Sequence, residues 1–265
     1  MLFRSARPGS DFDALARLVL IVGAEATRQR LPLIVHATGL REAKVALRAG
    51  AKLLVHSVQD KPLDIEFVAL AKATGAYYCP TLEVMDGYAA IPLAARTGNP
   101  PRLDDPFGAV DSLTRARVAL TADEARRQLG TQPPTRDSLY TALRRQMLDN
   151  LLLVRRSGIT VVTGTDAGNP FTLHGPAMIT EMEAMQAAGM KPAEVLLAST
   201  RDAAAAMGRA ADLGTIEKGK SADLLVVAAD PRLDIANLRR LEWVVRSGVA
   251  RSSRELRAAV ARTRW

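Results

Sequence analysis

The sequence is poor in cysteine and in aromatic residues: it holds one cysteine among 265 residues, and aromatic side chains make up 4% of it. A lone cysteine cannot form an internal disulfide, which excludes a disulfide-stapled domain and fits a reducing compartment. Cys79 precedes Pro80 inside an apolar run. We therefore interpret Cys79 as a packed thiol, with a nucleophilic cysteine as the alternative.

Long apolar runs are also missing. None approaches the roughly 20 residues that a membrane-crossing helix needs, and residues 1–9 lack the apolar centre of a secretion signal. These absences predict a cytoplasmic protein with no membrane partner. The apolar share of 48% is typical of a globular protein that buries one substantial core.

Positive charge exceeds negative charge, with 36 Lys and Arg against 28 Asp and Glu and a formal net charge of +8. A basic surface can attract nucleic acid through counterion release. Here the arginines are spread over expected helices, without the interleaved aromatic residues of single-strand binders. We expect a solvated basic surface and no nucleic-acid partner.

Apolar, β-branched segments alternate with amphipathic ones over most of the chain. Strands are expected at residues 31–35, 52–55, 76–84 and 159–164, and helices at residues 10–30, 41–49, 63–74, 139–156 and 178–188. Continuously apolar strands between helices predict an α/β fold with a parallel sheet, either open or closed into a barrel.

Two segments depart from this alternation. Residues 86–136 are rich in proline, glycine and aspartate, which predicts a long excursion that holds one helix and acts as a lid or substrate loop. From residue 213, glycine turns separate short apolar strands, and residues 251–265 carry one apolar stripe typical of a terminal helix. We therefore divide the chain into a main domain, 1–210, and a β subdomain, 211–265.

Three residues of types that bind metals come at the ends of apolar strands: His36, His56 and Asp166. In a parallel sheet all carboxyl ends face one side, so these side chains can meet although they are far apart in sequence. Imidazole and carboxylate suit Zn²⁺, and also Mn²⁺, Fe²⁺ or Co²⁺. The sequence therefore predicts a metal site at this edge.

Each candidate also has a structural interpretation. A histidine at a strand end can simply hydrogen-bond a loop, and Asp166 can cap the following helix. His174 lies on the loop after the last expected strand, where it contacts either substrate or solvent. We interpret Glu181 as a first-turn helix charge and Asp223 as a turn residue of the β subdomain.

An ordered series of motifs runs through the chain: apolar-His36, apolar-His56, Pro80-Thr81-Leu82, Gly164-Thr165-Asp166-Ala167-Gly168, Gly214-Thr215-Ile216 and Gly219-Lys220-Ser221-Ala222-Asp223-Leu224. In this order the chain closely resembles the amidohydrolase superfamily, and within it the imidazolonepropionase-like and Xaa-Pro dipeptidase-like branch. The resemblance covers nearly the whole chain.

The resemblance implies a (β/α)₈ TIM barrel with a β-sandwich subdomain, and a divalent metal, zinc by first expectation, that activates water for hydrolysis of amide-like bonds. His36 and His56 match the metal ligands that end the fifth and sixth barrel strands. Asp166 matches the aspartate that ends the eighth strand, which is both ligand and general base. His174 is a candidate substrate contact, and a dipeptide or another small molecule is the expected substrate.

The chain also departs from the family pattern. The His-x-His pair of the first strand and the bridging lysine or glutamate of the fourth cannot be placed among its three histidines and other residues. The resemblance thus implies a partial barrel, strands five to eight, in an amino-terminally truncated fragment with weak metal binding and little activity. Open sheet edges favour a homo-oligomer. The alternative is a non-catalytic remnant or dimerising half-barrel with a vestigial metal site.

Overall fold

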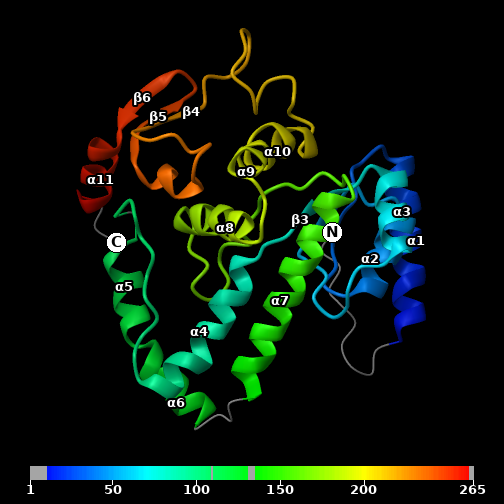
Figure 1. The fold of residues 1–265 in the computed structure, drawn as a ribbon, viewed down its shortest axis with the longest axis horizontal. Coiled ribbons are helices and arrows are strands. Elements are labelled where there is room, and N and C mark those ends of the chain that lie inside the picture. Colours follow the sequence, from blue (N-terminus) through cyan, green and yellow to red (C-terminus); the bar gives the residue numbers. More distant parts are fainter. Residues whose placement is uncertain (1–10, 109, 131–134, 263–265) are drawn as a thin grey trace.

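The amino-terminal part of the chain forms a three-stranded parallel sheet in the computed structural model, which describes residues 11–108, 110–130 and 135–262 (Figure 1). Its strands, in spatial order, are β1 (Ile34–His36), β2 (Leu53–Val55) and β3 (Tyr77–Cys79). Helices separate the strands along the chain, as in a βαβ series. The mixed α/β class predicted from the alternation is confirmed.

The fourth expected strand, residues 159–164, forms only a short ladder. Val161 makes an isolated parallel bridge with Tyr78, the Tyr78 N–H donates to the carbonyl of Thr160 over 2.9 Å, and the Val162 N–H donates to the carbonyl of Tyr78 over 2.9 Å. The third strand is also shorter than predicted. It ends at Cys79 because Pro80 lacks a donor and Thr81 has a φ of 48°.

Helices cover this sheet: α1 (Phe12–Arg28), α2 (Leu40–Arg48), α3 (Ile65–Thr74) and α7 (Thr135–Arg156). Asp11 caps α1 by accepting from the N–H groups of Asp13 and Ala14; Ser10, where the sequence placed the start of this helix, lies outside the described residues. Gly75 ends α3 in the left-handed conformation, with a φ of 62°, as its stop signal predicted.

The core lies between the sheet and these helices. Leu54 of β2, Phe67 of α3 and Leu151 of α7 are at most 2% exposed. Cys79 is buried as well, and burial raises the pKa of its thiol to about 12. A Cβ on Gly164 would lie 2.5 Å from the Cys79 Sγ, so the segment after residue 159 packs directly on this thiol. The prediction of a packed cysteine is confirmed.

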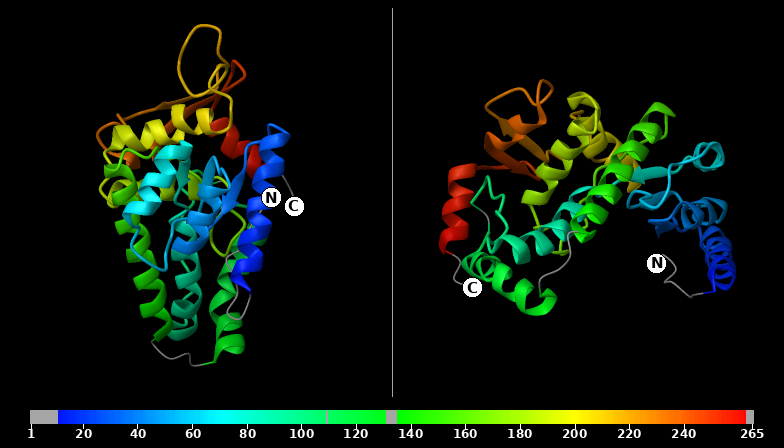
Figure 2. Two further views of the ribbon diagram at one scale, coloured as in Figure 1. Left: turned by 90° about the vertical axis from the view of Figure 1, so that its right-hand side faces the viewer. Right: turned by 60° about the horizontal axis from the view of Figure 1, so that its bottom comes forward.

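The excursion holds three helices where one was predicted: α4 (Glu83–Thr97), α5 (Ser112–Ala119) and α6 (Thr121–Leu129). Asp111 caps α5 by accepting from the Thr114 N–H over 2.8 Å. α4 packs against α6 and α7, and Figure 2 shows α4 and α7 running side by side away from the sheet. The prolines and glycines that suggested a loop mostly lie between these helices. Pro92 lies inside α4, and packing of α4 against α7 offsets the free-energy cost of a proline within a helix.

The last part of the chain carries α8 (Pro176–Ala187), α9 (Pro192–Ser199), α10 (Arg201–Ala206), β4 (Leu224–Val227), the 3-10 helix η1 (Ile235–Arg239), β5 (Leu241–Arg246), β6 (Val249–Ser252) and α11 (Ser253–Arg262). β4, β5 and β6 form an antiparallel sheet, as predicted for this region. Asp223 accepts from the Ser247 N–H over 2.6 Å, which confirms its turn role. No helix within the described ranges is long and apolar enough to cross a membrane.

Candidate metal centre

His36 and His56 meet at the carboxyl edge of the parallel sheet. The β ladder continues past the assigned strand ends, because the Ala37 N–H donates to the carbonyl of Val55 over 3.2 Å and the His56 N–H donates to that of Cys79 over 2.9 Å. The two imidazole centroids are 4.3 Å apart with an interplanar angle of 71°. Neighbouring parallel strands thus bring the first two predicted residues into contact.

Asp166 reaches the same point from the loop after Val162. Its Oδ2 lies 3.7 Å from Nε2 of His56. The side chain of His56 is only 12% exposed, whereas that of Asp166 is 45% exposed and open to solvent. His56 therefore contacts both His36 and Asp166, and the structure brings the three predicted side chains together.

Three strand ends beside one another carry a left-handed backbone. The φ angles are 74° at His56, 48° at Thr81 and 51° at Asp166. Non-glycine residues rarely adopt this region, and a β-branched residue such as Thr81 is strained there. Such conformations gather at functional sites, where the surrounding structure holds them in place. The strain marks this edge independently of the residue types.

A hydrogen bond and burial set the state of His56. Its Nδ1 is bonded to the Oγ1 of Thr81 over 2.6 Å, and Thr81 is only 3% exposed. Burial, followed by the neighbouring His36, lowers the pKa of His56 to about 4, although Asp166 acts in the opposite direction. A neutral ring held at one nitrogen offers the other, Nε2, to an ion on the side of Asp166. The sequence analysis assigned no role to Thr81, although its Pro80-Thr81-Leu82 motif was a signal.

A second group of polar contacts fixes Asp166. The Asn169 amide nitrogen donates to Oδ2 of Asp166 over 2.8 Å and to its main-chain carbonyl over 2.9 Å. The Tyr88 hydroxyl, on α4, donates to the Asn169 amide oxygen over 2.8 Å. The alternative role of Asp166 as a helix cap is wrong, because α8 begins ten residues later in sequence at Pro176 with Gly175 as its cap. Asn169 and Tyr88 carried no signal in the sequence.

His174 and Glu181 differ in how the structure places them. His174 is exposed, and its Nε2 lies 3.8 Å from the point that a Cβ on Gly168 would occupy, so it lies over the loop of Asp166. Glu181 is fully buried within α8, its Oε2 accepts from the Glu83 N–H over 2.8 Å, and burial raises its pKa to about 7. Its interpretation as a first-turn helix charge is wrong, since α8 begins two residues earlier than predicted and Glu181 lies buried beyond its first turn.

The donor set fits a divalent ion by its chemistry, with two imidazoles and one carboxylate. Its arrangement is open. In the part of the chain that the structure describes, no set of three or more His, Cys, Asp or Glu side chains is gathered as a metal site. His56 is the donor that contacts both of the others.

Comparison with known proteins agrees with this fold. The sequence profile of the amidohydrolase family matches residues 5–250, and the chain therefore belongs to that family. The imidazolonepropionase of Thermoplasma volcanium is 32% identical over 79 residues, which are 30% of this chain and 19% of that protein. The superfamily resemblance seen in the motifs is confirmed.

Solved structures share the fold. A Xaa-Pro dipeptidase with bound methionine superposes with a TM-score of 0.65 at 22% identity, over 89% of this chain and 48% of that one. A prolidase complexed with N-methylphosphonate-L-proline gives a TM-score of 0.62 at 19% identity, over 89% and 49%. The chain thus spans about half the length of these structures.

Proposed function

We propose that the chain serves metal-dependent hydrolysis of amide-like bonds, with a dipeptide or a cyclic amide as substrate. His36, His56 and Asp166 hold a divalent ion, zinc by first expectation, and Asp166 is also the general base. The observation that carries the proposal is the meeting of these three side chains at one edge of the sheet, where His56 contacts both of the others.

The relatives support the bond type. Family membership makes the chain an amidohydrolase-type protein, and similar proteins include an imidazolonepropionase and a Xaa-Pro dipeptidase. Enzymes of this superfamily typically use divalent metals. Under the proposal, β1, β2, β3 and the ladder at Val161 are strands five to eight of a (β/α)₈ barrel.

The environment of Asp166 suits a base. Its carboxylate is partly exposed and lies beside Nε2 of His56, so water can reach one side of it while the other side would hold an ion. Asn169 holds one carboxylate oxygen and the main-chain carbonyl in place. A bound divalent ion would supply Lewis-acid activation at this point.

Turnover by this chain alone is expected to be low. Three donors leave the remaining coordination positions of an ion without a protein ligand, and the chain holds only one other histidine, His174. Structural zinc sites use four ligands and catalytic sites about three with tight geometry. Weak binding and slow hydrolysis follow from this incomplete enclosure.

Metal titration of the purified chain tests the proposal. Co²⁺ is expected to bind the wild type and to lose its binding in His36→Ala, His56→Ala and Asp166→Asn. His174→Ala is the matched control and should bind as the wild type does. Absence of Co²⁺ binding, or binding that survives all three substitutions, would refute the site. Efficient hydrolysis of a dipeptide such as Met-Pro would contradict the expected low turnover.

A second function has one observation in its favour. The described residues gather no enclosed metal site, which suits a non-catalytic remnant or a dimerising half-barrel with a vestigial site. Elemental analysis after dialysis against Zn²⁺ separates the two, because a remnant should retain well under one equivalent. Sedimentation tests the homo-oligomer expected from the open sheet edges.

A further inference from the structure

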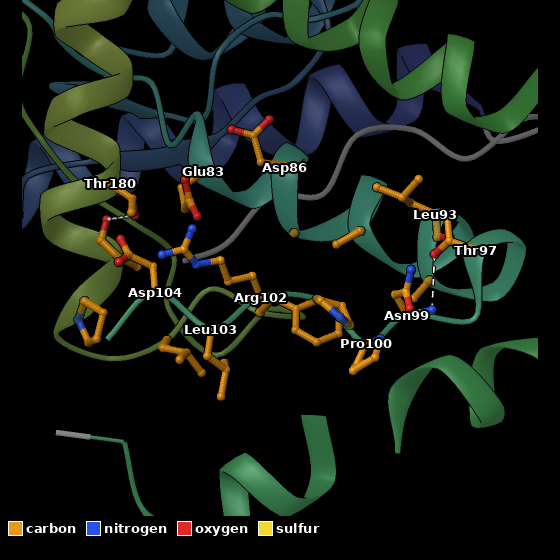
Figure 3. A pocket seen from close by; sticks show the side chains of 18 residues that line it. Glu83, Asp86, Leu93, Thr97, Asn99, Pro100, Arg102, Leu103, Asp104 and Thr180 are labelled. Atoms are coloured by element: carbon orange, nitrogen blue, oxygen red, sulfur yellow. Dashed lines mark hydrogen bonds between the residues drawn. The ribbon is translucent and has the colours of Figure 1, made fainter. Parts of the chain in front are cut away.

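A cavity of about 430 Å³ lies between α4, the segment that follows it, the loop after Asp166 and the start of α8 (Figure 3). Its volume is within the range of about 300–1,000 Å³ typical of small-molecule sites. Phe171 lines it, and the same loop carries Asn169, which bonds Asp166. The loop that follows Asp166 therefore supplies part of the cavity wall.

The cavity has a polar end and an apolar end. Figure 3 shows Glu83, Arg102 and Thr180 gathered at one end, with Leu93 towards the other. Leu103 and Phe171 add apolar surface to the lining. A ligand that fits both ends has a charged head and an apolar body.

Two carboxylates at the polar end are already neutralised. Asp86 accepts from the Arg144 guanidinium over 2.8 Å. Asp104 pairs with Arg239 over 2.6 Å, and Arg239 also holds Glu183. Because both carboxylates are already paired with arginines, neither needs a charged group from a ligand.

Glu83 and Arg102 remain. Neither makes an ion pair with another residue in the described ranges, and both side chains point into the polar end of the cavity. Glu83 is half-buried, which raises the pKa of its carboxyl to about 7. An acid and a base without ion pairs thus face the same end of the cavity. A hydrogen bond with Thr180 and the charge of Arg144 only partly offset the burial of the Glu83 carboxyl.

We propose that this cavity binds a free apolar α-amino acid as its zwitterion. Arg102 takes the α-carboxylate, Glu83 takes the α-ammonium, and the side chain lies along Leu93, Leu103 and Phe171. Guanidinium and carboxylate form strong, directional pairs. The inference rests on the proposed function, because hydrolysis of a dipeptide would release free amino acids.

Calorimetric titration of the EDTA-treated, metal-free chain with L-leucine tests the inference. L-leucinamide lacks the carboxylate and N-acetyl-L-leucine lacks the ammonium, so each should bind at least about tenfold more weakly than leucine. Arg102→Ala should weaken leucine binding by a similar factor and leave leucinamide unchanged. Glu83→Gln should weaken leucine and leave N-acetyl-L-leucine unchanged.

Controls separate this inference from the metal site. Arg17→Ala, an exposed arginine on α1, should bind leucine as the wild type does. His36→Ala should lose Co²⁺ and keep leucine, so failure of either site is seen on its own. Undetectable leucine binding, equal binding of the three ligands, or unchanged leucine binding by Arg102→Ala overturns the inference.

Discussion

The Asn169 amide holds the Asp166 carboxylate and its main-chain carbonyl at once, with hydrogen bonds of 2.8 and 2.9 Å. Tyr88, from α4, holds Asn169 in turn over 2.8 Å. The excursion after the third strand therefore reaches the candidate base through a single intermediate side chain. This contact gives the excursion a role in orienting the site.

Asn169→Ala should weaken Co²⁺ binding by about tenfold or more, because supporting contacts of metal ligands typically have effects of 10- to 100-fold. Tyr88→Phe should give a smaller loss in the same direction. The dissociation constant from a Co²⁺ titration measures both. Asn99→Ala, at an exposed position, is the control. Unchanged Co²⁺ affinity in Asn169→Ala would show that the hydrogen bonds from Asn169 to Asp166 do not affect metal binding.

Glu181 should make the protein less stable as the pH rises. Burial raises the pKa of Glu181 from its ordinary 4.5 to about 7, and Glu83 shifts in the same direction. Between these values the native state holds a proton that the unfolded chain has released, so the free energy of unfolding falls as pH increases through this window.

Urea unfolding between pH 5 and about 8 measures this slope. Glu181→Gln keeps an oxygen for the Glu83 N–H and removes the ionisation, so the slope should flatten and stability at the higher pH should rise. Glu242→Gln, at an exposed position, should leave the profile as in the wild type. A profile equally steep in Glu181→Gln would contradict the assignment.

Gly164→Ala should destabilise the chain by about 1–3 kcal/mol, the usual cost of overpacking a core. The new Cβ would lie 2.5 Å from the Sγ of Cys79. The double variant with Cys79→Ala should recover part of the loss, which a double-mutant cycle of unfolding free energies detects. Strictly additive effects would mean that the two residues do not clash.

Asn150→Ala should destabilise the segment that follows His56. Asn150 is 2% exposed; its oxygen accepts from the Leu63 N–H over 2.9 Å, and its nitrogen donates to the carbonyls of Val58 and Lys61 over 2.8 and 2.9 Å. Each buried group left without a partner costs about 1–3 kcal/mol. Hydrogen exchange of the Leu63 amide should rise markedly in this variant and stay unchanged in Asn99→Ala.

The sequence predicted the parallel strands because each is short, apolar and followed by a helix with clear end signals. That regularity also placed His36 and His56 at one edge. The meeting with Asp166 followed from the same topology, although the strand before it is reduced to a bridge at Val161. Residue type and strand order were enough to predict that these three side chains meet.

The contacts around that centre could not be predicted from the sequence. Tyr88 and Asn169 are 81 residues apart, and nothing local pairs them. Glu181 was interpreted as a first-turn helix charge because its burial depends on the packing of α8 against the start of α4. Only one helix was predicted in the excursion that holds α4, α5 and α6, because its proline-rich residues dominated the local pattern.

The left-handed backbone at Asp166 also limits what can stand in its place. Asparagine and glycine tolerate this conformation, whereas β-branched and bulky side chains do not. A descendant of this chain that lost the carboxylate would therefore carry Asn or Gly at position 166. Its loop would keep the same backbone conformation without the metal ligand.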